Sequence, residues 1–458
     1  MKYSDAVRDL DSIFRAGLER VDPYKVIEDH VRLEGSRLKV EMKGEMHEVD
    51  LDRFKRIFII GAGKATAPMA KVFENILGDR LDKGVIVVKY GHTVPLEKVE
   101  TVESGHPVPD EQGVRGAGEV ISLAKEAGED TLVITLVSGG GSALLPAPMS
   151  YEAEGRRVVL SLEDKQQTTK ALLRCGADIT EINCIRKHLS GLKGGRLLQH
   201  IAPATCLSFI LSDVVGDDLS SIASGMTAVD PTTFEDALGI IEKYGIADSV
   251  PAKVMQTLEY GRKGVIAETL KADGEAAALS TNILIGTLAQ AMAAAGEKAA
   301  GLGYNVVRLT SRVTGDAGET ARILAAIAAD TAGSELLSNK PACVISGGEP
   351  VVKLTGEGKG GRNQEMALVF LKEIQAHPEL FEGVTFLAAS TDGNDGPTDA
   401  AGAFASIEVL EKSKEKGLSI RDYLSRNDSY HFHEALDSLY KTGPTNTNVC
   451  DLHVMLVA

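Results

Sequence analysis

DTLVITLVSGGGS, residues 130–142, is the stretch that decides the fold class. It is a continuous apolar run that ends in three glycines flanked by two serines. Such a run, stopped by glycine, is typical of a parallel strand that is covered on both faces. Three other runs have the same character: RIFIIGAGK (56–64), GVIVVKYG (84–91) and ATCLSFILSD (204–213). The repetition predicts an open parallel sheet.

Helical segments alternate with these strands. In SLEDKQQTTKALLRCG, Ser161 opens the segment, Asp164 follows three residues later and Gly176 closes it. A serine followed at this spacing by an acidic residue resembles a capping box, and a closing glycine is typical of a helix end. The alternation of strands and helices predicts an α/β fold with a parallel sheet.

A second α/β series begins near residue 280. Its expected strands are NILIG, YNVVRLTS, ACVISGGEP, VTFLAASTDGNDG and DLHVMLV, with helices between them. The 458 residues of the chain also exceed the roughly 250–300 residues at which a single core stops growing. We therefore predict two α/β domains, over residues 1–270 and 271–458.

The composition limits the classes of partner. The chain has 49 Lys and Arg against 65 Asp and Glu, a net charge of -16, which repels nucleic acid and anionic membranes unless basic residues gather in a patch. We find no such patch, no signal-peptide pattern and no run of the roughly 18 apolar residues that a membrane span needs. We expect a cytoplasmic protein with no nucleic-acid or membrane partner, and a homo-oligomer is compatible with the sequence. The five cysteines are scattered, which favours reduced thiols.

The first glycine-rich loop is Gly61-Ala62-Gly63-Lys64-Ala65. In open parallel sheets, ligands bind beyond the carboxyl ends of the strands, where helix N-termini and backbone N–H groups attract anions. Lys64 would present its ammonium there to a phosphate or a carboxylate. The spacing is neither that of a Walker A loop nor that of the dinucleotide fingerprint. A tight turn with a surface lysine remains the alternative.

The second loop is Ser138-Gly139-Gly140-Gly141-Ser142. Consecutive glycines offer a run of backbone N–H groups that suits an oxyanion. A flexible linker is the alternative, but linkers do not usually follow an apolar strand directly. We predict that this loop binds phosphate or substrate.

Cations gather in EINCIRKHLSGLKGGRL, residues 181–197. Guanidinium and ammonium groups suit carboxylates and phosphates, so Arg186 and Lys193 are candidates for binding an anion. A solvated helix face is the alternative, and His188 is interpreted as a structural histidine.

Aspartates follow two of the expected strands. Carboxylates at strand ends hold Mg²⁺ or orient a substrate hydroxyl, although Asp is also common in turns. We expect one or two of them to be functional. The candidates are Asp213, for the attacking hydroxyl or for metal, and Asp392 and Asp395, for metal; Asp217, Asp218 and Asp399 lie in the same two segments.

Arg362 stands at the start of an expected helix in GEGKGGRNQEMAL. A cation at a helix N-terminus opposes the helix dipole. An anion that compensates this charge is therefore expected, and a transferring phosphoryl group is a suitable one.

These segments together resemble the MOFRL-type glycerate kinases over nearly the whole chain. The resemblance rests on GAGKA (61–65), SGHPVPDEQG (104–113), SGGGSALLPAP (138–148), RKHLSGLKGGRL (186–197), LSDVVGDDLSSIASG (211–225), DPTTF (230–234), SGGEP (346–350), GGRNQE (360–365), TDGNDGPTDAAGA (391–403) and TGPTNTNVCDL (442–452). One difference is Met226, where relatives usually have proline. This difference bears on the rigidity of that loop and on substrate fit.

The resemblance implies a kinase that transfers the γ-phosphate of ATP to D-glycerate with Mg²⁺ or another divalent cation. It implies an active site in the cleft between a Rossmann-like N-terminal domain and a smaller α/β C-terminal MOFRL domain, with Lys64 and Arg362 as its cations. It also favours 2-phospho-D-glycerate as the product, although no residue type selects the 2-hydroxyl over the 3-hydroxyl.

Three alternatives remain open at the level of sequence. They are a glycerate 3-kinase, a hydroxypyruvate reductase and a non-catalytic protein that binds a phosphorylated metabolite. The missing dinucleotide fingerprint argues against the reductase. The several acidic loops at strand ends are more than a sensor needs.

Overall fold

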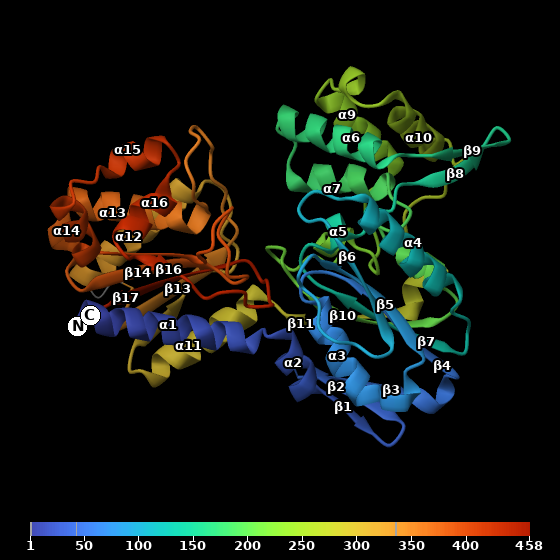
Figure 1. Ribbon diagram of the computed structural model, residues 1–458, viewed down its shortest axis with the longest axis horizontal. Coiled ribbons are helices and arrows are strands. Elements are labelled where there is room, and N and C mark those ends of the chain that lie inside the picture. Colours follow the sequence, from blue (N-terminus) through green and yellow to red (C-terminus); the bar gives the residue numbers. More distant parts are fainter. Residues whose placement is uncertain (1, 43, 335–336) are drawn as a thin grey trace. The chain divides into compact units, whose positions relative to one another are not determined.

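The computed structural model describes residues 2–42, 44–334 and 337–458, and Figure 1 shows how its elements follow one another. The chain forms two compact units. We call one the Rossmann unit, Val26–Ser212 and Asp217–Ile285. The other is the C-terminal unit, Met1–Lys25, Asp213–Gly216 and Gly286–Ala458. The units are thus not two consecutive lengths of chain, and the boundary between residues 270 and 271 stays a prediction.

The Rossmann unit is built on a six-stranded sheet. Its strands, in spatial order, are β11 (Ser280–Gly286), β10 (Thr205–Leu211), β7 (Thr131–Val137), β4 (Arg56–Ala62), β5 (Lys83–Lys89) and β6 (Val99–Ser104). The four pairs from β10 to β6 are parallel. When the six strands are numbered 1 to 6 in chain order, their spatial order from β6 to β11 is 3-2-1-4-5-6. This is the Rossmann arrangement. The predicted Rossmann-like fold is confirmed.

The sequence predicts that NILIG is the first strand of the second α/β series, and this prediction is wrong. The segment lies in β11, the last strand of the first sheet and the neighbour of β10. An apolar run predicts that a strand forms, but it does not predict which sheet the strand joins, because either sheet can bury its apolar side chains.

The helices of the Rossmann unit include the predicted one at α6 (Leu162–Cys175). Ser161 Oγ accepts a hydrogen bond from the Asp164 N–H, the Asp164 carboxylate accepts one from the Ser161 N–H, and Gly176 is left-handed with φ 79°. This confirms the capping box and the closing glycine. Three further helices pack with α6 around a separate apolar cluster: α7 (Ile179–His188), α9 (Phe234–Lys243) and α10 (Ala252–Arg262).

The remaining elements of this part of the chain are shorter or lie outside the main sheet. They are the helices α2 (Pro23–His30), α3 (Thr66–Leu77), α4 (Glu111–Lys125), α5 (Gly141–Leu144) and α8 (Arg196–Ile201), and the antiparallel strands β1 (Val31–Glu34), β2 (Arg37–Met42), β3 (Glu45–Asp50), β8 (Ser150–Ala153) and β9 (Arg156–Val159). None of the helices in the described residues has both the length and the apolar character that a membrane crossing requires.

The C-terminal unit contains a second six-stranded sheet. Its spatial order is β12 (Asn305–Arg308), β13 (Ala342–Gly348), β17 (Asp451–Val457), β14 (Val384–Ser390), β15 (Gly402–Ser406) and β16 (Leu439–Tyr440). Only β12 and β13 pair in parallel, and the other pairs are antiparallel. The last strand of the chain therefore lies inside the sheet, between β13 and β14.

Helices cover this sheet. They are α11 (Leu288–Gly301), α12 (Ala317–Gly333), α13 (Arg362–Ala376), α14 (Ile407–Glu415), α15 (Ile420–Ser425) and α16 (Ser429–Ala435). The first helix of the chain, α1 (Tyr3–Arg20), runs alongside α11 (Figure 1). A Cβ at Gly17 would lie 3.0 Å from the carbonyl oxygen of Ala291, so glycine allows the two helices to approach closely.

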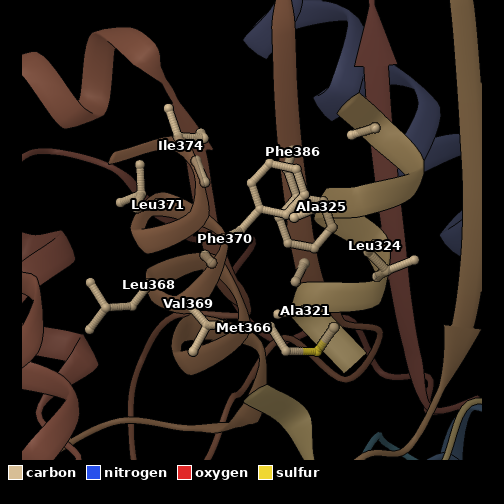
Figure 2. Packing of buried hydrophobic residues seen from close by; sticks show 14 of the residues in the cluster. Ala321, Leu324, Ala325, Met366, Leu368, Val369, Phe370, Leu371, Ile374 and Phe386 are labelled. Carbon is tan, nitrogen blue, oxygen red and sulfur yellow. The ribbon is translucent and has the colours of Figure 1, made fainter. Parts of the chain in front are cut away.

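Helix α13 is fixed by the core of the C-terminal unit (Figure 2). Its Phe370 stacks on Phe386 of β14, with ring centroids 4.4 Å apart and an interplanar angle of 16°. Ala321 and Leu324 of α12 belong to the same buried cluster. Stacked aromatic rings and close-packed apolar side chains hold a helix rigidly, and Arg362 is the first residue of this one.

Candidate active site

The two glycine-rich loops meet at the point where the strand order of the Rossmann sheet reverses. Strands β4 and β7 are neighbours there, and one loop follows each of them. The Lys64 N–H donates to the Gly139 carbonyl at 2.9 Å, and the Ala65 N–H donates to Ser138 Oγ at 3.0 Å. Ligands of doubly wound sheets bind at this switch point. The structure thus brings together the two loops that the sequence singles out.

Glycine is required in these loops because the two βα segments approach each other too closely for a Cβ atom. A Cβ at Gly61 would lie 2.2 Å from the Leu136 carbonyl oxygen, and one at Gly63 would lie 2.0 Å from Ser138 Oγ. Gly140 has φ 83°, and a Cβ there would lie 2.8 Å from His106 and 3.6 Å from Lys64 Cγ. Lys64 and His106 therefore flank the second loop. His106 lies in SGHPVPDEQG, a segment from which no site residue is predicted. The roles of Gly139, Gly140 and Gly141 in holding an anion stay predictions.

The two serines of the second loop have structural contacts. Ser138 is 1% exposed and its hydroxyl lies 3.2 Å from Thr66 Oγ1. Ser142 Oγ lies 2.9 Å from Ser224 Oγ. These contacts join the loop to helix α3 and to the segment that follows β10. Binding of an anion by either serine remains a prediction.

Lys193 lies against this loop. Its ammonium donates to the Ser142 carbonyl and to Ser142 Oγ, both at 2.7 Å. Burial, together with repulsion from Lys165 and Arg186, lowers the pKa of Lys193 well below its usual value. Arg186 is half-buried near the end of α7, and burial lowers its pKa too. Sequence reasoning missed Lys165, because nothing in the pattern of α6 marks it as a buried lysine.

A second group of charges lies in the C-terminal unit around Arg362. Its guanidinium donates from Nε to Asp451 Oδ2 at 2.5 Å and from Nη2 to Asp451 Oδ1 at 2.9 Å. Its Nη1 lies 3.2 Å from Glu349 Oε1. Part of the anion expected to compensate this helix N-terminal arginine is therefore supplied by the chain itself. Sequence reasoning missed both carboxylates, although each lies in a segment that it quoted, SGGEP and TGPTNTNVCDL.

Two of the predicted carboxylates belong to this group. Burial raises the pKa of Glu349, and the carboxylates of Asp451, Asp213 and Asp392 raise it further against the opposing effect of Arg362. For Arg362, burial alone would lower the pKa, but Asp451 and Glu349 raise it above the usual value, so the guanidinium keeps its charge. We call Asp213, Glu349, Asp392 and Asp451 the acidic cluster.

Asp395 caps helix α13. Its Oδ1 accepts the Asn363 N–H at 3.1 Å and its Oδ2 accepts the Gln364 N–H at 2.8 Å. The residue is 2% exposed, and burial raises its pKa to about 7. Both carboxylate oxygens thus satisfy backbone groups that the helix leaves unpaired. A role for Asp395 in metal binding stays a prediction.

Asp392 and Met226 lie in turns. Asp392 Oδ1 accepts hydrogen bonds from Ser390 Oγ and from the Asn394 N–H, both at 2.9 Å.

Met226 is 2% exposed and follows Ala223 and Ser224, which have left-handed φ values of 48° and 60°. Left-handed backbone thus lies just before Met226, and an effect of Met226 on loop rigidity and substrate fit stays a prediction.

The described residues contain no group of three or more His, Cys, Asp or Glu side chains arranged to hold a metal ion by themselves. Carboxylates of the acidic cluster have the oxygen donors that a Mg²⁺ site requires.

Comparisons with known proteins identify the family. A domain of unknown function, DUF4147, matches residues 9–259, and the MOFRL family matches residues 342–451. A glycerate 2-kinase of Pyrococcus horikoshii is 37% identical over 441 residues, 96% of this chain and 94% of the relative. A putative hydroxypyruvate reductase of Agrobacterium vitis is 39% identical over 406 residues, 88% of this chain and 87% of the relative. The crystal structure of glycerate kinase from Thermotoga maritima matches with a TM-score of 0.82 and 36% identity, covering 99% of this chain and 100% of that one. The chain belongs to the MOFRL-type glycerate kinase family.

Proposed function

We propose that this chain transfers the γ-phosphate of ATP to the 2-hydroxyl of D-glycerate. The observation that carries the proposal is the position of Lys64 beside the loop Ser138–Ser142 at the switch point of the Rossmann sheet. A cation next to a run of backbone N–H groups suits a phosphorylated substrate. The name of the Pyrococcus relative supports the same reaction.

Phosphoryl transfer requires positioning and charge neutralisation more than covalent chemistry by the protein. In the proposed mechanism, Lys64 and Arg362 neutralise the γ-phosphoryl group, and Asp451 and Glu349 orient Arg362. The glycerate hydroxyl attacks in line, Asp213 accepts its proton, and the bond to the leaving ADP breaks. The loop Ser138–Ser142, with Arg186 and Lys193, binds the remaining negative charge.

ATP would enter as its Mg²⁺ complex. Carboxylate oxygens are the ligands that Mg²⁺ prefers, and within the acidic cluster Asp392 supplies them, while Asp213 serves the attacking hydroxyl. When bound, the cation neutralises phosphate charge and orients the phosphate groups. Asp395 is less suited to this task, because both of its carboxylate oxygens accept backbone hydrogen bonds.

Incubation with D-glycerate, ATP and Mg²⁺, followed by enolase, tests the proposal directly. Enolase consumes only the 2-phosphate, so formation of phosphoenolpyruvate in this assay supports a glycerate 2-kinase. ADP formation that depends on glycerate, with a product that enolase uses only after phosphoglycerate mutase is added, would instead indicate the 3-kinase.

Hydroxypyruvate reduction is the second candidate, because the Agrobacterium relative is named for it. The first loop, GAGKA, lacks the third glycine of the dinucleotide fingerprint, which allows the helix to pack closely on the strand. Oxidation of NADH or NADPH by hydroxypyruvate, with no ATP present, would establish the reductase. We expect no oxidation.

A cytoplasmic location is also proposed. The five cysteines are free, and four of them are buried, as expected of thiols in a reducing compartment. Cell fractionation tests this location, and we expect to recover the protein apart from membranes and from secreted material.

A further inference from the structure

Three cations, Lys165, Arg186 and Lys193, gather near the loop Ser138–Ser142. Lys165 is 9% exposed and Lys193 is 3% exposed, while Arg186 is half-buried. In the part of the chain that the structure describes, none of the three forms an ion pair. The guanidinium of Arg186 makes no hydrogen bond to any described residue. We call these three residues the cation cluster.

The cation cluster is assembled from three segments that pack together. Lys165 lies on α6, Arg186 on α7 and Lys193 in the turn before α8. The Lys165 ammonium donates to the Pro146 carbonyl. The Lys193 ammonium donates to the carbonyl of Ser142, which lies in the same segment as Pro146. The Gly191 N–H donates to the Ala147 carbonyl at 3.0 Å, which holds the turn against the same segment. The three charges are therefore placed by the fold and not by surface side-chain motion.

The nearby cations of the same segments show what a structural charge looks like here. Lys187, also on α7, is 4% exposed and binds Asp230 at 2.6 Å. The carboxylates of Glu268 and Asp230 raise the pKa of Arg196 against the larger effect of burial. Buried charges require partners, because desolvation otherwise costs several kcal/mol. The cation cluster lacks such partners, and it repels itself.

We propose that the cation cluster is an oxyanion subsite of the kinase, in which Lys165 binds the anion together with Arg186 and Lys193. The anion is either the carboxylate of glycerate or a phosphate group of the nucleotide, since both present the same negatively charged oxygens. This proposal rests on the proposed function and adds to it Lys165 as a binding residue.

The donors that remain fit one acid group. An ammonium has three N–H donors and a guanidinium has five. Lys165 uses one donor on Pro146 and Lys193 uses two on Ser142, so both retain a donor. Arg186 retains its fork, which suits bidentate binding of a carboxylate or a phosphate. A bound anion would also remove the repulsion that, after burial, lowers the pKa of Lys165 to about 7.

Calorimetric titration of the full chain tests the subsite. The probes are D-glycerate, inorganic phosphate and a non-hydrolysable ATP analogue, each titrated alone into wild type, Lys165→Met and Arg186→Met. The matched control is Lys170→Met, which changes an exposed lysine on the same helix. We expect the Kd of at least one probe to rise about tenfold or more in both variants, as for the loss of a charge-assisted hydrogen bond, and to be unchanged in the control.

The three titrations distinguish whether the bound anion is the glycerate carboxylate or a nucleotide phosphate. Weaker binding of D-glycerate alone assigns the subsite to the carboxylate, and weaker binding of the ATP analogue alone assigns it to a phosphate. If Kd values for all three probes stay within about twofold of wild type in both variants, the proposal is wrong. Thermal unfolding of each variant shows whether it is folded, and Lys165→Arg, which keeps the charge, distinguishes lost binding from lost packing.

Failure of the proposed function gives a different result. If wild type does not phosphorylate glycerate but binds inorganic phosphate in a manner that depends on Lys165, the oxyanion subsite is correct and the kinase assignment is wrong. If wild type is an active glycerate kinase and the Lys165 variants keep wild-type KM values for both substrates, the kinase assignment is correct and the subsite is wrong.

Discussion

Arg362 and Asp451 form a two-point ion pair, with Nε and Nη2 of the guanidinium bound to the two carboxylate oxygens at 2.5 and 2.9 Å. Arg362 begins helix α13 and Asp451 begins strand β17. The side chain of Asp451 is 0% exposed, whereas 29% of the Arg362 side chain is exposed. The pair therefore fixes the orientation of the guanidinium, whose Nη1 lies 3.2 Å from Glu349 Oε1.

The first prediction concerns this pair. Arg362→Ala should lower kcat/KM for glycerate phosphorylation by about 100-fold or more, as for loss of one transition-state donor. It should also lower the free energy of unfolding by about 3 kcal/mol, because Asp451 stays buried without its partner. Steady-state kinetics and urea unfolding measure the two effects.

A double variant separates activity from stability. Arg362→Ala with Asp451→Ala removes both buried charges, so we expect part of the stability to return and the activity to stay low. Recovery of activity in the double variant would show that Arg362 acts only on stability.

The second prediction concerns Lys64. Lys64→Ala should reduce kcat/KM by about 100-fold or more, since the ammonium lies beside the loop proposed to bind phosphate. Lys55→Ala is the matched control, because Lys55 precedes strand β4, whereas Lys64 follows it, and its side chain is 83% exposed. Near wild-type kinetics for Lys64→Ala would reject the proposed mechanism.

The third prediction separates a helix cap from a metal ligand. Asp395→Ala should lower the free energy of unfolding by about 1–2 kcal/mol, as for loss of an N-terminal cap, and Asp395→Asn should lower it less. Asp392→Asn, in contrast, should raise the Mg²⁺ concentration that gives half-maximal activity. A larger shift in the Mg²⁺ requirement for Asp395→Asn than for Asp392→Asn would assign the metal role to Asp395.

The fourth prediction concerns stability and pH at Lys165. Its pKa is about 7 in the folded chain, where burial and Arg186 lower it, against an ordinary value of 10.5. Between these pH values the unfolded chain binds more protons at this group, so its contribution to stability rises with pH. Below pH 7 the full cost of burying the charge is present, at about 1.4 kcal/mol for each unit of pKa difference.

Lys165→Met should therefore be more stable than wild type at pH 6, and this excess should shrink as the pH rises towards 10. Urea unfolding of both proteins at pH 6 and pH 9 measures it. Each pH is roughly a unit or more from the folded pKa. An excess at pH 6 no larger than that at pH 9 would contradict the prediction.

Much of the fold could be predicted from local patterns. The runs that end at Gly61 and Gly139 give strands β4 and β7, and the capping box at Ser161 begins α6. The partners of a strand could not be predicted in this way. NILIG lies beside β10 and not in the second sheet, because pairing depends on residues far away in the sequence.

For the candidate site, the sequence marks the charged residues but not their partners. Lys64 and Arg362 stand out because they follow glycines at the start of a helix. Asp451 does not, since an aspartate at the beginning of an apolar strand looks like the end of a turn. Lys165 is also hidden, because a lysine within a polar helix is usually exposed, and only packing against Pro146 and α7 buries it.

The position of α1 has a practical consequence for dividing the gene. Phe14 of α1 is fully buried and meets Tyr440 edge-on, with ring centroids 5.2 Å apart. A fragment that starts at Gly286 would leave this apolar surface in water and would tend to aggregate. The chain ends lie close together (Figure 1), and Tyr3 packs on the same core as Val457. A short linker from Ala458 to residue 2 would therefore give a circularly permuted fragment, residues 286–458 followed by 2–25, in which the missing helix is restored.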